Sequence, residues 1–279
     1  MQRFNSTLRR SLPTPRVAAR KPFAMQYMSS SMRRAISPVL LLVVWELASR
    51  TGLLDPHFVP PPSVVLTELG RMIVSGELLT DLWASLRRIL MGFAISVVVS
   101  VLIGALMARM SLVEDLLDPI IELIRPVSPL AIYPLAILWF GLDDASKVFI
   151  IALSCSFPVI LNTYAGVREI NQSYIQVARS LGASSVEIFF KVVLKGAMPQ
   201  IFTGVRLAWG ISLIVIIAAE MVGGTGGLGY MVLNAQQTFR VDQVFAGIII
   251  IGALGYGTDF LFRRLCHKLM PWHQQFRGR

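Results

Sequence analysis

The chain has 279 residues, of which 54% are hydrophobic and only 15% are charged, and its mean hydropathy is +0.64. A soluble protein of this length needs more polar side chains to cover its surface, so this composition favours a multi-pass helical membrane protein. The formal net charge is +10. Because the hydrophobic stretches already place the chain in a bilayer, this charge indicates contact with anionic lipid. No nucleic-acid-binding motif accompanies it.

The first 34 residues form a separate segment. They are rich in Arg and Ser, contain several prolines and carry no acidic side chain. This composition predicts that residues 1–34 are a basic cytoplasmic tail without a fixed structure. An organelle transit peptide has a similar composition and is the alternative.

Six hydrophobic stretches follow, and most approach the length of about 20 residues that a bilayer-spanning helix needs. A helix satisfies its own backbone hydrogen bonds, so helices are the expected form. The first stretch is short and contains Glu46, so it either crosses the bilayer or leaves the N-terminus outside. The stretches lie at about 35–49, 86–107, 120–140, 148–167, 201–222 and 244–262.

The connecting segments set the orientation. With six spans and a cytoplasmic N-terminus, most of the 26 Lys and Arg residues fall on the cytoplasmic side. The positive-inside rule therefore places both termini there. We predict an all-α membrane protein with about six transmembrane helices: a first helix at 35–50, an outer segment at 51–81 with an amphipathic helix at about 63–73, a five-helix core at 82–265 and a second basic tail at 266–279.

A long cytoplasmic connection covers residues 168–199 and contains two sequences typical of capping boxes. In the first, Ser173 is followed three residues later by Gln176. In the second, Ser184 is followed by Glu187. In such a pair the hydroxyl accepts a backbone N–H and the longer side chain reaches back, so each pair predicts a helix start.

Gly182 lies between these two starts and can adopt the left-handed conformation that ends a helix. We therefore predict two short helices joined at Gly182. Gly196 and Pro199 are expected to break the chain before the fifth span. A helix pair that merely packs on lipid is the alternative interpretation of this loop.

Four residues are candidates for a pore or gate. Pro126, Pro129 and Pro134 lie in the third stretch, where each loosens the helix by removing a backbone donor. A broken helix is tolerated in a membrane where it faces protein or water, although a kink needed only for packing is equally consistent. Glu220 lies near the outer end of the fifth stretch, where an acid is costly unless it is paired. It could gate the outer mouth or pair with an Arg across a dimer.

A glycine-rich segment follows Glu220. Thr225 and five glycines lie between residues 223 and 229. We expect a flexible outer loop or re-entrant segment there, which could meet a partner outside the membrane.

No motif for catalysis, cofactor binding or metal binding is evident. The chain has no Gly-x4-Gly-Lys-Ser/Thr phosphate loop, no His-Glu-x-x-His, and no metal-ligand spacing around Cys155 and Cys266. An enzyme within the membrane is therefore disfavoured, and so is a channel. An ion-coupled secondary carrier is the main alternative class, but such carriers usually place acids deep in their spans.

The cytoplasmic loop resembles the signature Glu-Ala-Ala-x3-Gly-x9-Ile-x-Leu-Pro of the permease subunits of ABC importers. Ala178, Gly182 and Leu194 match it, Gln176, Val177 and Val192 are near substitutions, and Lys195 replaces the proline. Further segments, including 59–62, 82–88, 118–126 and 227–232, resemble the branch of permeases for taurine, alkanesulfonates, nitrate and bicarbonate. The resemblance covers about residues 36–273, and taurine permeases look most similar.

This resemblance implies a type I ABC importer permease fold in a bacterial inner membrane. It implies a homodimer, two ATPase subunits that bind ATP and Mg²⁺, and a periplasmic substrate-binding protein, with no enzyme activity in this chain. The cargo would be a small anion or zwitterion such as taurine or another sulfonate, or alternatively nitrate or bicarbonate. The implied ATPase-coupling residues are Ser173, Gln176, Val177, Ala178, Arg179, Ser180, Leu181, Gly182, Ala183, Ser184 and Glu187.

Overall fold

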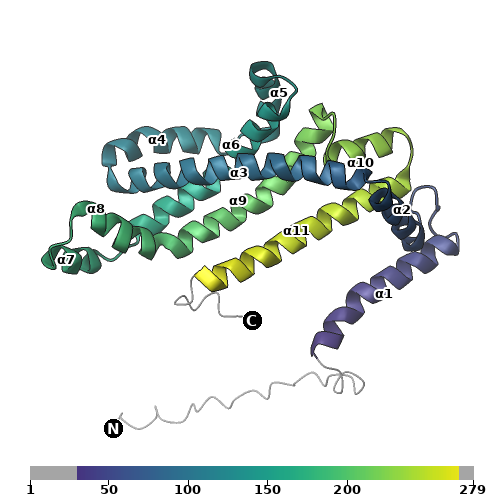
Figure 1. The fold of residues 1–279 in the computed structure, drawn as a ribbon, viewed down its shortest axis with the longest axis horizontal. Helices are drawn as coiled ribbons and strands as arrows, with labels where there is room; N and C mark the ends of the chain where they lie inside the picture. Colours follow the sequence, from purple (N-terminus) through teal and green to yellow (C-terminus); the bar gives the residue numbers. More distant parts are fainter. Residues whose placement is uncertain (1–29, 270–279) are drawn as a thin grey trace, which may run out of the picture.

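The computed structural model describes residues 30–269, with side chains described for residues 36–264. All regular structure in this part of the chain is helical. Figure 1 shows long helices lying side by side, with shorter helices at both ends. The elements are α1 (Ser30–Arg50), α2 (Pro62–Val74), α3 (Glu77–Arg109), α4 (Ser111–Ile124), α5 (Pro129–Phe140), α6 (Asp144–Arg168), α7 (Gln172–Ser180), α8 (Ser185–Ile188), the π turn η2 (Phe189–Val193), α9 (Leu194–Gly223), α10 (Leu228–Gln237) and α11 (Val241–Leu269).

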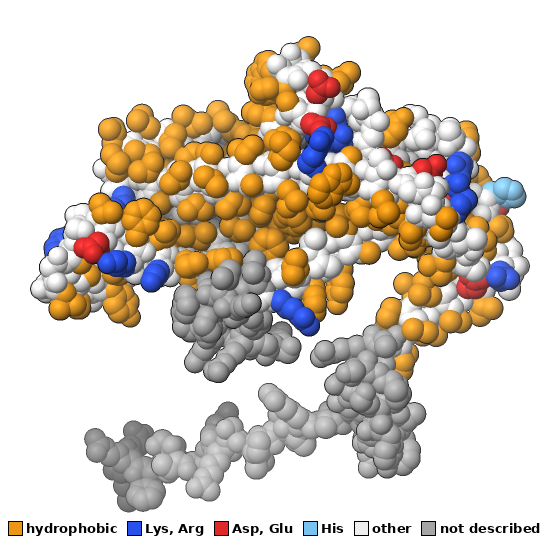
Figure 2. Space-filling model, in the orientation of Figure 1, with side chains coloured by type: hydrophobic (Ala, Val, Ile, Leu, Met, Phe, Trp, Pro, Cys, Tyr) orange, Lys and Arg blue, Asp and Glu red, His pale blue; other side chains and the backbone are white. Residues whose placement is uncertain are grey.

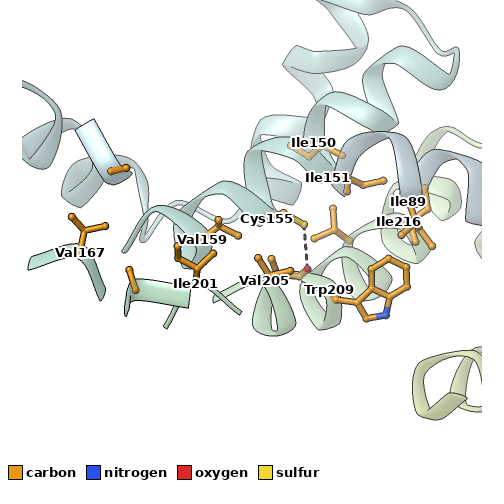
Figure 3. Close-up of a cluster of buried hydrophobic side chains, with 14 of the residues drawn as sticks. Ile89, Ile150, Ile151, Cys155, Val159, Val167, Ile201, Val205, Trp209 and Ile216 are labelled. Carbon is orange, nitrogen blue, oxygen red and sulfur yellow. Dashed lines mark hydrogen bonds between the residues drawn. The ribbon is translucent and has the colours of Figure 1, made fainter. Parts of the chain in front are cut away.

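The core lies between α3, α6 and α9. Its buried side chains are mostly β-branched or small, and Figure 3 shows those of α6 and α9 facing one another. Cys155 is buried there and its thiol donates a hydrogen bond of 3.2 Å to the carbonyl of Ala208 on α9. Burial among apolar groups makes this a packing cysteine rather than a reactive one.

Small residues allow α3 to approach α6 closely. Gly92, Ser96, Ser100 and Gly104 recur every four residues and are all buried, so they form one stripe along α3. A Cβ added at Gly104 would lie 2.7 Å from the carbonyl of Ile160. Packing of small residues is a common basis of helix association in membranes, where burial of apolar surface gives little drive.

Four helical segments are long and apolar enough to cross a membrane: α3, α6, α8 to α9, and α11 up to Arg264. The pair α4 and α5 would be a fifth, bent by 102° at its break. The predicted third stretch at 120–140 is therefore not one straight helix: residues 125–128 separate two arms, and Pro126 lies in this break, as expected of a proline that loosens a helix. Of α1, side chains are described only for residues 36–50, too few to test it as a span, so the count of six spans stays a prediction.

The fifth span is longer than expected. The helical backbone runs from Ser185 through η2 to Gly223, 39 residues, without a break. The prediction that Gly196 and Pro199 end the loop helix is wrong. Both lie inside α9, and the Thr203 hydroxyl donates to the carbonyl of Pro199 at 2.9 Å. The carbonyl that loses its donor is that of Lys195, four residues before Pro199, and packing neighbours let a membrane helix tolerate such a loss.

The remaining helices pack at one end of this core. The amphipathic helix expected at 63–73 is α2, and it begins with Pro62 at its first turn, a position where proline suits a helix. Its buried residues Val65 and Met72 join a second hydrophobic cluster with α10 and α11. Trp45 of α1 lies against Phe245 of α11, with ring centroids 5.4 Å apart.

The predicted tails fall mostly outside the described residues. Of the N-terminal tail, residues 1–29 are not described, and α1 begins at Ser30, inside the predicted tail. Likewise, α11 continues to Leu269, past the predicted start of the C-terminal tail at 266. The positions of both termini relative to the membrane remain predictions.

Candidate functional site

The loop of α7 and α8 lies at one end of the long helices, which we call the loop end (Figure 1). Asn171 caps α7, and its side chain accepts the backbone N–H of Ser173 at 2.9 Å. The capping box predicted for Ser173 and Gln176 is therefore wrong: the cap lies two residues earlier, because an Asn side chain serves equally well there.

The second predicted start is confirmed. Ser184 accepts the backbone N–H of Glu187 at 3.3 Å, and Glu187 accepts the N–H of Ser184 at 3.1 Å, which makes a complete capping box. Gly182 has φ of +81°, and its N–H donates to the carbonyl of Arg179 at 3.0 Å. The predicted joint at Gly182 is thus present, in a conformation that favours glycine.

The two faces of this loop differ. Ile175, Ala178 and Ala183 pack against the core. On the opposite side, Leu181 is 82% exposed, and three further apolar side chains are more than half exposed: Tyr174, Val177 and Val186. Figure 2 shows hydrophobic and basic side chains together at this end of the molecule. Apolar side chains gathered on a projecting loop are typical of a protein contact, and packing of this helix pair on lipid stays the alternative. The predicted coupling residues Gln176, Arg179 and Ser180 are exposed on the same short helix.

Glu220 marks the opposite end of the long helices, which we call the far end. Its side chain is fully buried. Its carboxylate accepts hydrogen bonds from Ser85 at 2.8 Å, from Arg88 at 2.7 Å and from the backbone N–H of Gly229 at 3.0 Å. Three donors, of which Arg88 is charged, therefore satisfy the hydrogen-bonding needs of this carboxylate away from water.

Arg88 connects Glu220 to two other elements. Its Nε donates to Asp144 at the start of α6, at 2.6 Å, and its Nη1 donates to the carbonyl of Gly226 at 2.8 Å. Arg87 also pairs with Asp144. The cluster therefore ties α3, α6, α9 and the turn before α10 together. Of the two roles expected for Glu220, the Arg partner is found within the same chain, as Arg88, and a role in gating the outer mouth stays a prediction.

The glycine-rich turn closes around this pair. Gly227 has φ of +115°, and a Cβ there would lie 2.3 Å from the Glu220 carboxylate. Its N–H donates to Asp81 at 2.8 Å, and the next N–H, of Leu228, donates to Ser85 at 2.9 Å. The expected flexible segment is therefore a tightly packed turn that leads into α10, and the glycines allow its close approach to Glu220.

The predicted pore prolines lie elsewhere. Pro126 is at the bend between α4 and α5, Pro129 is at the first turn of α5 and Pro134 is inside α5. None of them contacts the Glu220 cluster through a described hydrogen bond, but Tyr133, buried beside Pro134, points its hydroxyl toward Gly223 at the end of α9. A pore role for the prolines stays a prediction.

Sequence reasoning missed the side-chain partners of Glu220, which are Ser85 and Arg88, and it missed Asp144, the second carboxylate that Arg88 contacts. One signal was present: Arg87 and Arg88 stand at the mouth of an apolar stretch, where unpaired cations are costly. No feature of the sequence joins them to a residue 132 positions away.

Long apolar helices, a projecting amphipathic loop and a buried ion pair define a multi-pass helical membrane component. The chain belongs to the family of binding-protein-dependent transport system inner membrane components, whose model matches residues 84–270. It is therefore an inner-membrane permease of an ABC importer, as the loop residues indicated.

Several relatives match nearly the whole chain. The putative aliphatic sulfonates transport permease protein SsuC of Bacillus subtilis is 35% identical over 96% of this chain and 97% of its own length. The taurine transport system permease protein TauC of Escherichia coli is 38% identical over 84% of this chain and 87% of its own length. The nitrate import permease protein NrtB of Synechocystis is 30% identical over 92% of this chain and 95% of its own length.

Solved structures share the fold. A chain of the MetNI methionine ABC transporter in an inward-facing conformation superposes with a TM-score of 0.59, at 15% identity, over 67% of this chain and 93% of that one. A chain of an amino acid ABC transporter superposes with a TM-score of 0.57, at 20% identity, over 72% of this chain and 96% of that one. The type I importer permease fold predicted from the sequence is confirmed.

Proposed function

We propose that this chain forms half of the translocation pathway of an ATP-driven importer for a small sulfonate such as taurine. The relatives named for taurine and aliphatic sulfonates support the cargo class, since both are at least 35% identical over most of their length. Nitrate is a second candidate cargo, because a nitrate permease is 30% identical over 92% of this chain.

The observation that supports this role best is the physical link between the two ends of the molecule. The exposed apolar tip at Leu181 offers a contact for another protein at the loop end. From Ser185 onward, one continuous helical backbone of 39 residues leads to Gly223, three residues past the buried Glu220. At 1.5 Å per residue this backbone is about 58 Å long.

In the proposed cycle, two ATPase subunits hold the α7–α8 loops of two permease copies. Closure of the ATPases around ATP and Mg²⁺ moves each loop as a rigid body, and α9 carries that motion to the far end. There the Arg88–Glu220 cluster would separate or re-form as the pathway opens to one side and then the other. A periplasmic binding protein would deliver the cargo to that end.

ATP is bound by the partner in this scheme. The sequence contains no phosphate loop of its own, so the permease contributes movement rather than hydrolysis. No cofactor is needed in this chain for that role.

The test is ATPase activity of the permease co-purified with its ATPase partner in lipid nanodiscs. A cognate binding protein is added empty, loaded with taurine or loaded with nitrate. We expect stimulation by the taurine-loaded protein and little by the empty one. Stimulation only by the nitrate-loaded protein would show that nitrate is the cargo, and the proposed importer role would stand.

Failure of the permease to associate with an ATPase would overturn the proposed coupling. Uptake in proteoliposomes then tests whether the protein is an ion-coupled carrier. Transport that follows a proton or sodium gradient and ignores ATP would identify an ion-coupled carrier instead.

A further inference from the structure

A cavity of about 270 Å³ lies at the loop end, between the ends of two spans and the α7–α8 loop. It is slightly smaller than the roughly 300–1,000 Å³ of pockets for drug-sized ligands, so it has room for a small anion and water. Its lining residues come from α3, α6, α7, α8, η2 and the connection between α6 and α7: Ala108, Arg109, Val167, Arg168, Ile170, Gln172, Ile175, Arg179, Ser185, Ile188 and Val193.

Three arginines from three different helices line this cavity. Arg109 ends α3, Arg168 ends α6 and Arg179 is in the last turn of α7. A cation at a helix C-terminus complements the helix dipole, which explains one arginine at each end. It does not explain why the three helix ends meet around a single cavity that contains no carboxylate in its lining.

The positive charge is only partly neutralised. Arg168 pairs with Glu114, which also accepts a hydrogen bond from Tyr164. The guanidinium carbon of Arg109 lies 5.0 Å from the centre of the Phe189 ring, and Arg109 forms no ion pair within residues 36–264. Arg179 likewise has no ion pair among the described side chains. Two uncompensated guanidinium groups therefore border the cavity.

We propose that this cavity binds a tetrahedral oxyanion, a phosphate or sulfonate group, between Arg109, Arg168 and Arg179. Guanidinium groups present forked N–H donors that match such oxygens. The side-chain amide of Gln172 and the hydroxyl of Ser185 add neutral donors in the same lining. The apolar side chains of Ile170, Ile188 and Val193 form the remaining wall of the cavity and exclude water there.

The anion has two possible sources. Basic residues at the cytoplasmic ends of spans attract anionic lipid, so the phosphate of a headgroup can reach this depth. A free oxyanion in the cytoplasm carries the same chemistry. In either case it would bridge the ends of α3 and α6 to the loop that begins α9, and so stiffen the joint between the loop and the spans.

The binding test needs only the full-length permease in neutral detergent, without ATP or an ATPase. Its result is therefore independent of the importer cycle proposed above. Isothermal titration is run with inorganic phosphate, with methanesulfonate and with dioctanoyl phosphatidylglycerol, and dioctanoyl phosphatidylcholine serves as the zwitterionic control. The variant is Arg109→Gln with Arg179→Gln. The matched control is Arg264→Gln, since Arg264 also stacks on an aromatic ring, at 4.5 Å from Phe260, outside the cavity.

We expect wild type and Arg264→Gln to bind alike, and the double variant to bind roughly tenfold more weakly or worse, because charged hydrogen bonds are lost. Binding of phosphate or methanesulfonate assigns a free oxyanion. Binding of phosphatidylglycerol alone assigns a lipid headgroup. Equal binding by wild type and the double variant, or no binding of any anionic probe, overturns the site. If the double variant does not fold by circular dichroism, Arg179→Gln alone must weaken binding.

Discussion

At the scale of single residues, the far end of the molecule depends on one carboxylate. Glu220 is fully buried, and its charge is tolerated because Arg88, Ser85 and a backbone N–H all donate to it. Removing one member of such a pair leaves the other charge buried, and that costs far more than the pair itself contributes. Stability should therefore respond asymmetrically to substitutions in this cluster.

Glu220→Ala is expected to lower the free energy of unfolding by about 3–5 kcal/mol, because Arg88, Ser85 and the Gly229 N–H all lose their buried acceptor and only the partly exposed Asp144 is left to pair with Arg88. The measurement is reversible unfolding in mixed detergent and dodecyl sulfate micelles. Asp259→Ala is the control, since Asp259 pairs with Arg206 and Arg263 at an exposed site, and it should cost about 0–1 kcal/mol for each pair. Similar costs for the two substitutions would show that the Glu220 cluster is open to water.

A second carboxylate fixes the amphipathic helix α2. Glu68 is buried and accepts two hydrogen bonds from Arg71, at 2.8 and 2.6 Å, and one each from Arg240 and Gln243 at 2.9 Å. The hydrogen bonds from Arg71 hold the pKa of Glu68 below its usual 4.5, aided by Gln243. These contacts connect α2 to the turn between α10 and α11.

Because the pKa of Glu68 is lowered on folding, its stabilising contribution is complete above about pH 4.5 and is lost as the pH falls through the lowered pKa. Hydrogen exchange in residues 62–74, corrected for the intrinsic rate at each pH, should accelerate below that value. Glu68→Gln should exchange faster at neutral pH and lose most of the acid effect. If exchange in Glu68→Gln still accelerates at low pH as it does in the wild type, the acid effect comes from another titrating group.

At the scale of helices, close packing rests on particular glycines. Gly204 of α9 faces α6, and a Cβ there would lie 2.7 Å from the carbonyl of Pro158 and 2.7 Å from the Cβ of Asn162. Backbone cannot yield as a flexible side chain does. The two helices would have to separate along their contact, which weakens dispersion over the whole interface.

Gly204→Ala is accordingly expected to destabilise the protein by about 1–3 kcal/mol, as overpacking does. Gly252→Ala on α11 is the matched control, because a Cβ there has nothing within 4 Å. It should be neutral or stabilising by up to about 1 kcal/mol through helix propensity. Dodecyl sulfate unfolding measures both, and an equal effect would exclude close packing as the cause.

The loop end supplies a conformational test of coupling. Gly182→Val places a β-branched residue at φ of +81° and should distort the joint between α7 and α8. In the reconstituted importer we expect cargo uptake per ATP hydrolysed to fall severalfold. Gly52→Val is the control, since Gly52 has φ of +77° in the connection between α1 and α2. Normal uptake per ATP in Gly182→Val would contradict the coupling role of this joint.

At the scale of the whole molecule, hydropathy predicted most of the fold. Apolar stretches near residues 86–107, 148–167 and 244–262 all proved to be long helices, since a bilayer leaves few other forms. The bend between α4 and α5 was not predicted as such, because proline content marks a weak point but not its angle. The continuity through Pro199 was also missed, since tertiary packing decides whether a membrane helix survives a proline.

The candidate sites were predictable to different degrees. Local signals located the loop, because Gly182 and the box at Ser184 and Glu187 act within a few residues of one another. The partners of Glu220 come from two other elements, α3 and α10, and only the packed structure brings them together. The cavity lined by Arg109, Arg168 and Arg179 likewise depends on where three helices end.

The π turn η2 lies between the loop and α9, and such a turn contains one residue more than an α-helical turn would. Deleting Lys191 should convert it to α-helix and leave the loop at nearly its present angle about α9, because five π-helical residues turn the chain about as far as four α-helical residues. We expect normal span stability by dodecyl sulfate unfolding and retained ATP-driven uptake. Deletion of Thr225, outside this helix, is the comparison, and it should instead disturb the Glu220 cluster and lower stability. Loss of uptake after the Lys191 deletion, with the spans still stable, would contradict this.

The extra residue in η2 therefore gives this part of the chain tolerance to a change in length. A straight α-helix turns by about 100° for each residue added or removed, so a deletion within α9 would point the loop in another direction. A deletion in η2 removes the bulge instead, and it leaves both the direction of the loop tip and the contacts among the spans in place.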